Sequence, residues 1–349
     1  MAARFCDSFD AYLTADLLLR WTGEILGAGS IGPSAGNGRN GTSSLRITGT
    51  AGNQIDVFKT LTSQPTWIIG VAFRTPSLAS GDGGDIVTLC DVHPNIQVSF
   101  RYTSGGAIQA LRNGTLLGTS SGGSLVANVY AYLEFLVTIS STVGVVTVRL
   151  NGVQILSLTG QNTQATGNAS ADTIGLGTIS GPGGTSGLAW DYDDLYVLDG
   201  TGAANNAFLG DTRVQALRST GAGHSTQFAL GAGTSNWEAV SEATEDGDTT
   251  YVDSATAGQI DAYTFGALTP VSGTIPFLQT MLVARKDDAG IRTVADVISD
   301  GITDHVGASN NVGTSYQQWL TIHETDPVTS AAFTLANVNA RQYGVEEVA

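Results

Sequence analysis

The sequence predicts an all-β protein built from two sandwich-like domains. The chain has 349 residues, enough for two domains that each bury a core of their own. Hydrophobic residues make up 42% of the chain and charged residues 13%, so small polar residues and 45 glycines must cover much of the surface. Glycine supplies the φ > 0 positions of tight hairpins, while Thr and Val suit pleated strands. We therefore expect many short strands and no long helices.

Strand-like runs alternate with turn signals in the first half of the chain. Residues 45–58 and 67–73 are rich in β-branched and aromatic residues and predict strands. Asn113-Gly114 and Asn151-Gly152 each follow an apolar-rich run, and Asn-Gly between such runs is the strongest short-range signal of a β-hairpin. A series of short antiparallel strands joined by turns favours a sandwich.

The second of these hairpins also predicts which face is buried. Val146, Val148 and Leu150 share one side of the strand that precedes the turn, whereas Val145, Thr147 and Arg149 share the other. One face is therefore apolar and the other mixed, as expected for a strand of a sandwich whose outer face meets solvent.

The remainder of the first domain contains one strand, a long polar stretch and a closing strand. Residues 130–139 have strong β propensity. Residues 161–187 are rich in Gly, Asn, Thr and Ser and predict long surface loops. Residues 188–198 restore a strong strand pattern and are expected to form the last strand of this domain. The boundary is placed within residues 201–209.

The predicted domains are residues 1–208, a sandwich, and residues 209–349, a second mainly-β domain. The second domain shows its own series of strand-like runs, at residues 237–240, 248–252, 260–265, 277–285, 291–298 and 342–348. Residues 286–290 offer hairpin-turn residues, and residues 334–340 predict a short helix or a loop.

Charge and cysteine content exclude several classes of function. Thirty-one acidic residues against 15 basic ones give a formal charge of −16, which disfavours nucleic acid and anionic membranes as partners. No apolar run of about 18 residues and no signal-peptide pattern occurs, so we expect folding in a cytoplasm. Cys6 and Cys90 are isolated and predict small buried side chains, not a disulfide or a zinc site.

The acidic residues near the end of the first domain are the strongest candidates for chemistry. Asp191 and Asp193 point to one face of a strand, as a catalytic carboxylate pair requires, but this spacing is common and solvation or packing is the simpler explanation. Asp193 and Asp194 are candidate Ca²⁺ ligands together with a loop carbonyl. We assign no catalytic or cofactor-binding residue and no other metal ligand.

Other polar clusters fit no known metal or nucleophile pattern. The run from Glu242 to Asp248 lacks the spacing of a calcium loop and is expected to be a solvated turn. The four histidines are far apart in sequence, which favours surface or turn positions over metal ligation; they are His93, His224, His305 and His323. No P-loop is present in the sequence, and the Gly-rich segments lie between predicted strands, where turns are needed, and not at the start of a helix.

Several motifs together resemble proteins of tailed bacteriophages. Over residues 1–208 the chain resembles laminin-G-like, concanavalin-type jelly rolls of phage structural proteins, through residues 9–21, 190–199 and 149–153. The second half is similar to the partner domain in such proteins, through residues 208–217, 236–237, 248–252 and 325–329.

This resemblance implies a non-enzymatic structural component of a phage particle: a minor tail, baseplate, fibre-associated or capsid-decorating protein. Its expected partners are other virion subunits and further copies of the chain, and its expected location is the virion, after synthesis in the bacterial cytoplasm. Closed symmetry is the norm for such oligomers.

Two other classes of function stay open at this point. A carbohydrate-binding module for attachment to the host surface would use aromatic faces and loop amides or carboxylates, and related jelly rolls often bind sugars with calcium. The tryptophans available for stacking are more readily explained as core or domain-interface residues; they are Trp21, Trp67, Trp190, Trp237 and Trp319. A glycosidase would depend on Asp191 and Asp193 alone.

Overall fold

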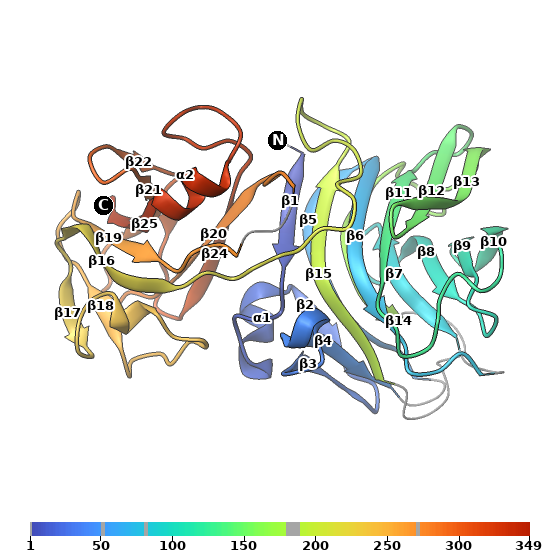
Figure 1. Ribbon diagram of the computed structural model, residues 1–349, viewed down its shortest axis with the longest axis horizontal. Coiled ribbons are helices and arrows are strands. Elements are labelled where there is room, and N and C mark those ends of the chain that lie inside the picture. Colours follow the sequence, from blue (N-terminus) through green and yellow to red (C-terminus); the bar gives the residue numbers. More distant parts are fainter. Residues whose placement is uncertain (1, 50–52, 80–82, 179–188, 270–272) are drawn as a thin grey trace. The chain divides into compact units, whose positions relative to one another are not determined.

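The computed structural model describes residues 2–49, 53–79, 83–178, 189–269 and 273–349 (Figure 1). The paired strands within it are antiparallel, which confirms the all-β prediction. The chain divides into two compact units, Met1–Val214 (unit 1) and Gln215–Ala349 (unit 2). The sequence places the boundary slightly earlier, after residue 208.

The helices are short. In the part of the chain that the structure describes, the α-helices are α1 (Leu17–Arg20) and α2 (Leu335–Ala340). None of the described helices has the length and apolar character needed to cross a membrane.

Unit 1 is a sandwich of two sheets. Among the described residues one sheet has eight strands, in the order β13-β12-β11-β6-β15-β4-β3 with β1 added beside β15. These strands are β1 (Ala3–Asp7), β3 (Ser30–Ser34), β4 (Ser44–Thr48), β6 (Thr66–Arg74), β11 (Ala131–Thr138), β12 (Gly144–Leu150), β13 (Val153–Gln161) and β15 (Ala189–Asp199).

The second sheet of unit 1 has seven described strands, in the order β10-β9-β8-β7-β14-β5-β2. They are β2 (Gly23–Ile25), β5 (Ile55–Gln64), β7 (Gly84–Cys90), β8 (Ile96–Tyr102), β9 (Ile108–Arg112), β10 (Thr115–Thr119) and β14 (Ala171–Thr178).

Aromatic side chains fill the space between these two sheets. Tyr102 of the seven-stranded sheet contacts Phe73 and Trp190 of the eight-stranded sheet, at ring-centroid distances of 5.8 and 6.3 Å. Trp190 also donates a hydrogen bond from Nε1 to the Tyr102 hydroxyl (2.9 Å). Aromatic pairs of this kind contribute about 0.5–1.5 kcal/mol beyond the area they bury. The face of each sheet that carries these residues is its inner face.

The cysteines and the tryptophans of unit 1 are buried. Cys6 and Cys90 are buried free thiols, as predicted, and burial raises the pKa of each to about 12. Trp21, Trp67 and Trp190 are at most 3% exposed, which confirms them as core residues and removes them as platforms for a sugar ring.

Both predicted Asn-Gly hairpins are present in unit 1. Asn113 and Gly114 have φ of 39° and 84°, and Asn151 and Gly152 have φ of 48° and 80°, the left-handed geometry that a type I′ turn requires.

The expectation of surface loops throughout residues 161–187 is wrong. Residues 171–178 form β14, a buried strand between β5 and β7 in the seven-stranded sheet. Its small residues are needed there because a Cβ on Gly177 would lie 2.4 Å from the carbonyl oxygen of Ile55. Residues 179–187 lie outside the described residues.

Unit 2 is smaller, and its described residues form one main sheet and two separate two-stranded sheets. The main sheet has the order β16-β19-β25-β21-β22, with β23 also paired to β21, and the two-stranded sheets are β17-β18 and β20-β24. The strands are β16 (Ser219–Thr226), β17 (Ala229–Ala232), β18 (Tyr251–Asp253), β19 (Ile260–Phe265), β20 (Leu278–Ala284), β21 (Thr293–Ser299), β22 (Asp304–Val306), β23 (Asn310–Asn311), β24 (Gln317–His323) and β25 (Gln342–Glu347).

Two expectations for unit 2 are wrong. Residues 238–240 form a 3-10 turn, not a strand. Residues 286–290 do not close a hairpin, because β20 pairs with the distant β24 and β21 pairs with β25.

Candidate functional site

The outer face of the eight-stranded sheet carries charged side chains from several strands. Asp191 of β15 lies opposite Arg46 of β4 on one side and Arg74 of β6 on the other. Alternation along β15 places Asp191 and Asp193 on this outer face, while Tyr192 between them enters the core. The predicted shared face of the two aspartates is therefore confirmed.

Asp191 holds two arginines in place. Arg46 donates to it from Nε (2.8 Å) and Nη2 (3.0 Å), and Arg74 donates from Nη2 (2.7 Å) and Nε (3.1 Å). The Asp191 carboxylate is 3% exposed, whereas the side chains of Arg46 and Arg74 are 33% and 25% exposed. The hydrogen bonds to Asp191 raise the pKa of Arg46, so its guanidinium group stays protonated.

Asn37 and Tyr130 complete this group. The Asn37 side-chain oxygen accepts from Nη2 of both arginines (2.8 and 3.3 Å), and its carbonyl accepts from the Tyr130 hydroxyl (2.7 Å). The guanidinium carbon of Arg74 lies 4.9 Å from the centre of the Tyr130 ring. We call Asn37, Arg46, Arg74, Tyr130 and Asp191 the arginine platform.

Each arginine of the platform keeps one nitrogen available. The hydrogen bonds described above use Nε and Nη2, and within the described part of the chain Nη1 of Arg46 and Nη1 of Arg74 have no hydrogen-bond partner. Two guanidinium groups share one carboxylate, so the platform carries a net positive charge. It can therefore donate to an anion or to sugar hydroxyls.

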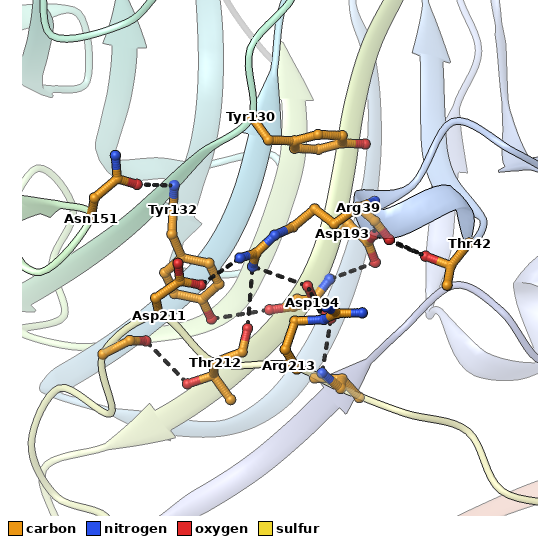
Figure 2. Close-up of polar contacts among 12 residues, drawn as sticks. Arg39, Thr42, Tyr130, Tyr132, Asn151, Asp193, Asp194, Asp211, Thr212 and Arg213 are labelled. Atoms are coloured by element: carbon orange, nitrogen blue, oxygen red, sulfur yellow. Dashed lines mark hydrogen bonds and ion pairs between the residues drawn. The ribbon is translucent and has the colours of Figure 1, made fainter. Parts of the chain in front are cut away.

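A second charged cluster occupies the same sheet face further along β15, where the strand bulges (Figure 2). Asp194 has a φ of 50°, and the register with β6 shifts between Asp193 and Tyr196. Arg39 donates its backbone N–H to Asp193 (2.7 Å) and its Nη1 to Asp194 (3.0 Å). The bulge thus turns two consecutive carboxylates toward one arginine.

The end of unit 1 covers this cluster. Residues 208–214, which we call the strap, cross the outer face after β15. Val214 donates its N–H to Asp194 (2.8 Å), Gly210 donates to Glu134 (2.8 Å), and Asp211 accepts from Nη2 of Arg39 (2.6 Å). Figure 2 shows Asp211, Thr212 and Arg213 gathered around Arg39 and Asp194.

Burial changes the acidity of both aspartates. Desolvation, with repulsion from Asp194, raises the pKa of Asp193 from 3.8 to about 7. Desolvation also raises the pKa of Asp194, although Val214, Arg39 and Arg213 oppose this. Both carboxylates are at most 2% exposed.

The candidate calcium site at Asp193 and Asp194 does not have the required free oxygens. Asp193 accepts N–H groups of Arg39 and Asp194, one on each oxygen. Asp194 accepts the Val214 N–H on one oxygen, and on the other it accepts Nη1 of Arg39 and is ion-paired with Arg213. Calcium needs six to eight oxygen ligands that point inward. Within the described ranges, no group of three or more His, Cys, Asp or Glu side chains is arranged to hold a metal.

The remaining sequence candidates are also occupied. Asp191 is ion-paired with two arginines and Asp193 accepts backbone N–H groups at short distance, so they form no free carboxylate pair. In the acidic run, Glu242 and Asp246 accept hydrogen bonds from Thr250. The histidines lie apart: His93, His224 and His323 each contact a different aspartate.

Sequence reasoning missed Asn37, Arg46, Arg74 and Tyr130. A usable signal was present for the two arginines, because each is a cation at an outward position in or at the end of an otherwise apolar strand. The pairing of both with Asp191 depends on strand order, which the sequence does not reveal.

Comparisons with known proteins find similar solved structures but no family. No protein-family model and no curated protein matches the sequence. A sialidase structure matches 56% of this chain and 18% of its own chain, with 11% identity and a TM-score of 0.42. The alginate lyase Aly36B matches 56% of this chain and 97% of its own, with 12% identity and the same TM-score. The alginate lyase vAL-1 from Chlorella virus matches 54% and 98%, with 11% identity and a TM-score of 0.39.

These matches correct the prediction that the chain is not an enzyme. That prediction followed from the resemblance to phage structural proteins, whereas the matched structures named here are a sialidase and two alginate lyases, which are enzymes. The matched segment is less than one fifth of the sialidase chain, and at these identities and scores the likeness carries no ligand or reaction over to this chain. The same matches give no support to a laminin-G domain or a phage virion protein.

Proposed function

We propose that unit 1 binds carbohydrate that carries carboxylate groups, and that the arginine platform is its binding site. One observation carries the proposal: two partly exposed guanidinium groups are fixed by one buried carboxylate, and each keeps Nη1 free among the described residues. The carbohydrate-binding alternative drawn from the sequence is thereby preferred to the virion hypothesis.

The fixed arginines favour binding through preorganisation. Their Nε and Nη2 atoms are already held by Asp191 and Asn37, so little side-chain entropy remains to be lost when a ligand arrives. Guanidinium groups match the geometry of a carboxylate, and the charge-assisted hydrogen bonds that result are about twice as strong as neutral ones.

The Tyr130 side chain adds the second part of a sugar site. Its hydroxyl is held by the Asn37 carbonyl and its ring lies beside Arg74. Burial raises the pKa of Tyr130, so the phenol stays uncharged and does not repel an acidic sugar. A half-buried aromatic ring next to fixed donors is a common arrangement for sugar recognition.

The test is a comparison of acidic and neutral oligosaccharides by calorimetry, following a glycan array. We expect uronate-containing oligosaccharides to bind, and we expect Arg46→Gln and Arg74→Gln each to weaken binding about tenfold. Arg101→Gln is the matched control, because Arg101 also pairs with a buried aspartate, Asp85, but on the seven-stranded sheet. Equal affinity for neutral oligosaccharides, or unchanged affinity in both platform variants, would refute the proposal.

Cleavage of the same oligosaccharides should be measured as well, since the comparisons do not decide whether the chain catalyses a reaction. Cleavage that disappears in the Arg74→Gln variant would make the platform part of an enzyme that acts on the bound saccharide. Binding without cleavage would assign a recognition role alone.

The virion location, virion-subunit partners and homo-oligomeric state stay predictions from the sequence resemblance. Mass photometry of the purified chain tests the oligomer, and cryo-electron microscopy of a parent particle tests the location. Density for the chain on a tail or shell would place the saccharide-binding face on a particle surface.

A further inference from the structure

A small polar hollow lies at one end of the unit 1 sandwich, away from the arginine platform. It has a volume of about 260 Å³ and is lined by Arg112, Asn113, Thr115, Gln164 and Ala165. The first three belong to the β9–β10 hairpin of the seven-stranded sheet, and the other two belong to the loop that follows β13.

The walls of this hollow are fixed by one buried side chain. Gln97 of β8 is fully buried, and its Oε1 accepts the N–H groups of Ala165 (2.6 Å) and Thr166 (3.1 Å). The carbonyl of the same residue accepts the N–H of Asn113 (3.2 Å). Gln97 therefore ties the hairpin turn and the loop to each other, so the hollow is formed before any ligand arrives.

Most side-chain polar groups that line the hollow have no partner within the described residues. Among the described residues, the Arg112 guanidinium, the Asn113 amide and the Thr115 hydroxyl have no hydrogen-bond or ion-pair partner. Gln164 donates from Nε2 to the carbonyl of Thr166 (3.0 Å), which leaves its Oε1 free to accept. The charge of Arg112 is thus not neutralised by any acidic residue of the described lining.

We propose that this hollow binds a single sugar unit that carries a carboxylate, of the hexuronic acid class. Arg112 is the charged residue of the described lining and matches a carboxylate. The amide and hydroxyl groups beside it match ring hydroxyls, and an apolar ligand would leave all of them unsatisfied. The volume is slightly below the usual range for drug-sized ligands and suits one monosaccharide.

The test uses the full chain and D-glucuronate as the probe, with binding followed by ligand-observed NMR. We expect glucuronate to bind, and we expect Arg112→Gln to weaken this binding about tenfold or more. Lys286→Gln removes a surface cation of unit 2 and serves as the control. Thr115→Trp places a bulky ring at the lining and should abolish binding while circular dichroism stays unchanged.

Three results would overturn the inference. They are unchanged affinity in Arg112→Gln, equal affinity for glucose, and equal affinity for inorganic phosphate. The double variant Arg46→Gln/Arg74→Gln separates this site from the platform, since it should leave glucuronate binding at Arg112 within about twofold. If the platform proposal fails, the Arg112 result still stands by itself.

Discussion

Two clusters of arginine and aspartate share the outer face of one sheet, yet they differ in access to solvent. In the platform, Asp191 is buried but its two arginines are 33% and 25% exposed. In the other cluster, Asp193 and Asp194 are themselves buried, and backbone N–H groups take up three of their four carboxylate oxygens. The same residue types are therefore available to a ligand where the arginines are exposed, and they hold the strap in place where the aspartates are buried.

The largest expected effect is a difference in the unfolding free energy lost when one aspartate is removed from each cluster. Asp194→Ala leaves the Val214 N–H and the charge of Arg39 without their buried acceptor, and we expect a loss of about 3–5 kcal/mol in unfolding free energy. Asp191→Ala should cost about 1–2 kcal/mol, because the partly exposed arginines can be rehydrated. Chemical unfolding of both variants measures the difference.

Asp194→Asn is the control for this experiment. Asn tolerates the positive φ of residue 194 and keeps an oxygen that can accept the Val214 N–H. It should therefore lose less stability than Asp194→Ala. Equal losses in the two alanine variants would contradict the proposed difference between the clusters.

The second effect is a pH dependence confined to the covered cluster. Because the pKa of Asp193 rises from 3.8 to about 7 on folding, the folded state holds the proton more tightly between these pH values. This contribution to stability is fully present below about pH 4 and is lost as the pH rises through about 7.

Unfolding free energies of the wild type and Asp193→Ala, measured from pH 4.5 to 8, test this dependence. The stability advantage of the wild type should shrink by about 3 kcal/mol over that range. A constant advantage would show that Asp193 titrates at its ordinary value, and one that grew with pH would show that folding lowers its pKa; either result contradicts the prediction.

A third effect concerns the backbone of the strap. Gly210 has a φ of 85°, and beyond its chain neighbours no described atom lies within 4 Å of the point where a Cβ would stand. Gly210→Ala therefore tests backbone conformation alone, and we expect a loss of about 1 kcal/mol with faster proteolysis within residues 205–215. Gly114→Ala has a similar φ of 84° and equally open space, so it should cost the same energy without exposing the strap.

The smallest effect is expected for Asp211, the exposed partner of Arg39. The Asp211 side chain is 48% exposed, so Asp211→Asn should cost less than about 1 kcal/mol, and the cost should vanish in high salt. Unfolding at low and high ionic strength measures this. A large, salt-independent loss would place Asp211 among the buried members of the cluster.

Local patterns in the sequence predicted the elements that depend on near neighbours. Alternation placed Val146 and Val148 in the core, and the two Asn-Gly turns formed as expected. The prediction failed for residues 171–178, where Thr and Gly suggested loops, because close approach of neighbouring strands selects small residues in a buried strand.

The candidate site was less predictable because its contacts are distant in sequence. Asp191 lies 145 residues from Arg46 and 117 from Arg74, and it meets them only because β15 lies between β4 and β6. Asp193 and Asp194 were named from the sequence as candidate Ca²⁺ ligands, but the role of Asp194 as an anchor for the strap depends on a bulge that no local pattern reveals.

The strap also determines which contacts of unit 1 bear a pulling force first. Gln215 follows directly on Val214, so a pull applied through unit 2 reaches the Val214–Asp194 hydrogen bond before it reaches any strand of the sandwich. The contacts of Arg213 with Asp194, and of Thr212 and Asp211 with Arg39, come next, followed by that of Gly210 with Glu134 on β11. Load would therefore break these bonds one after another and lengthen the connection between the units, while both sheets of unit 1 keep their register.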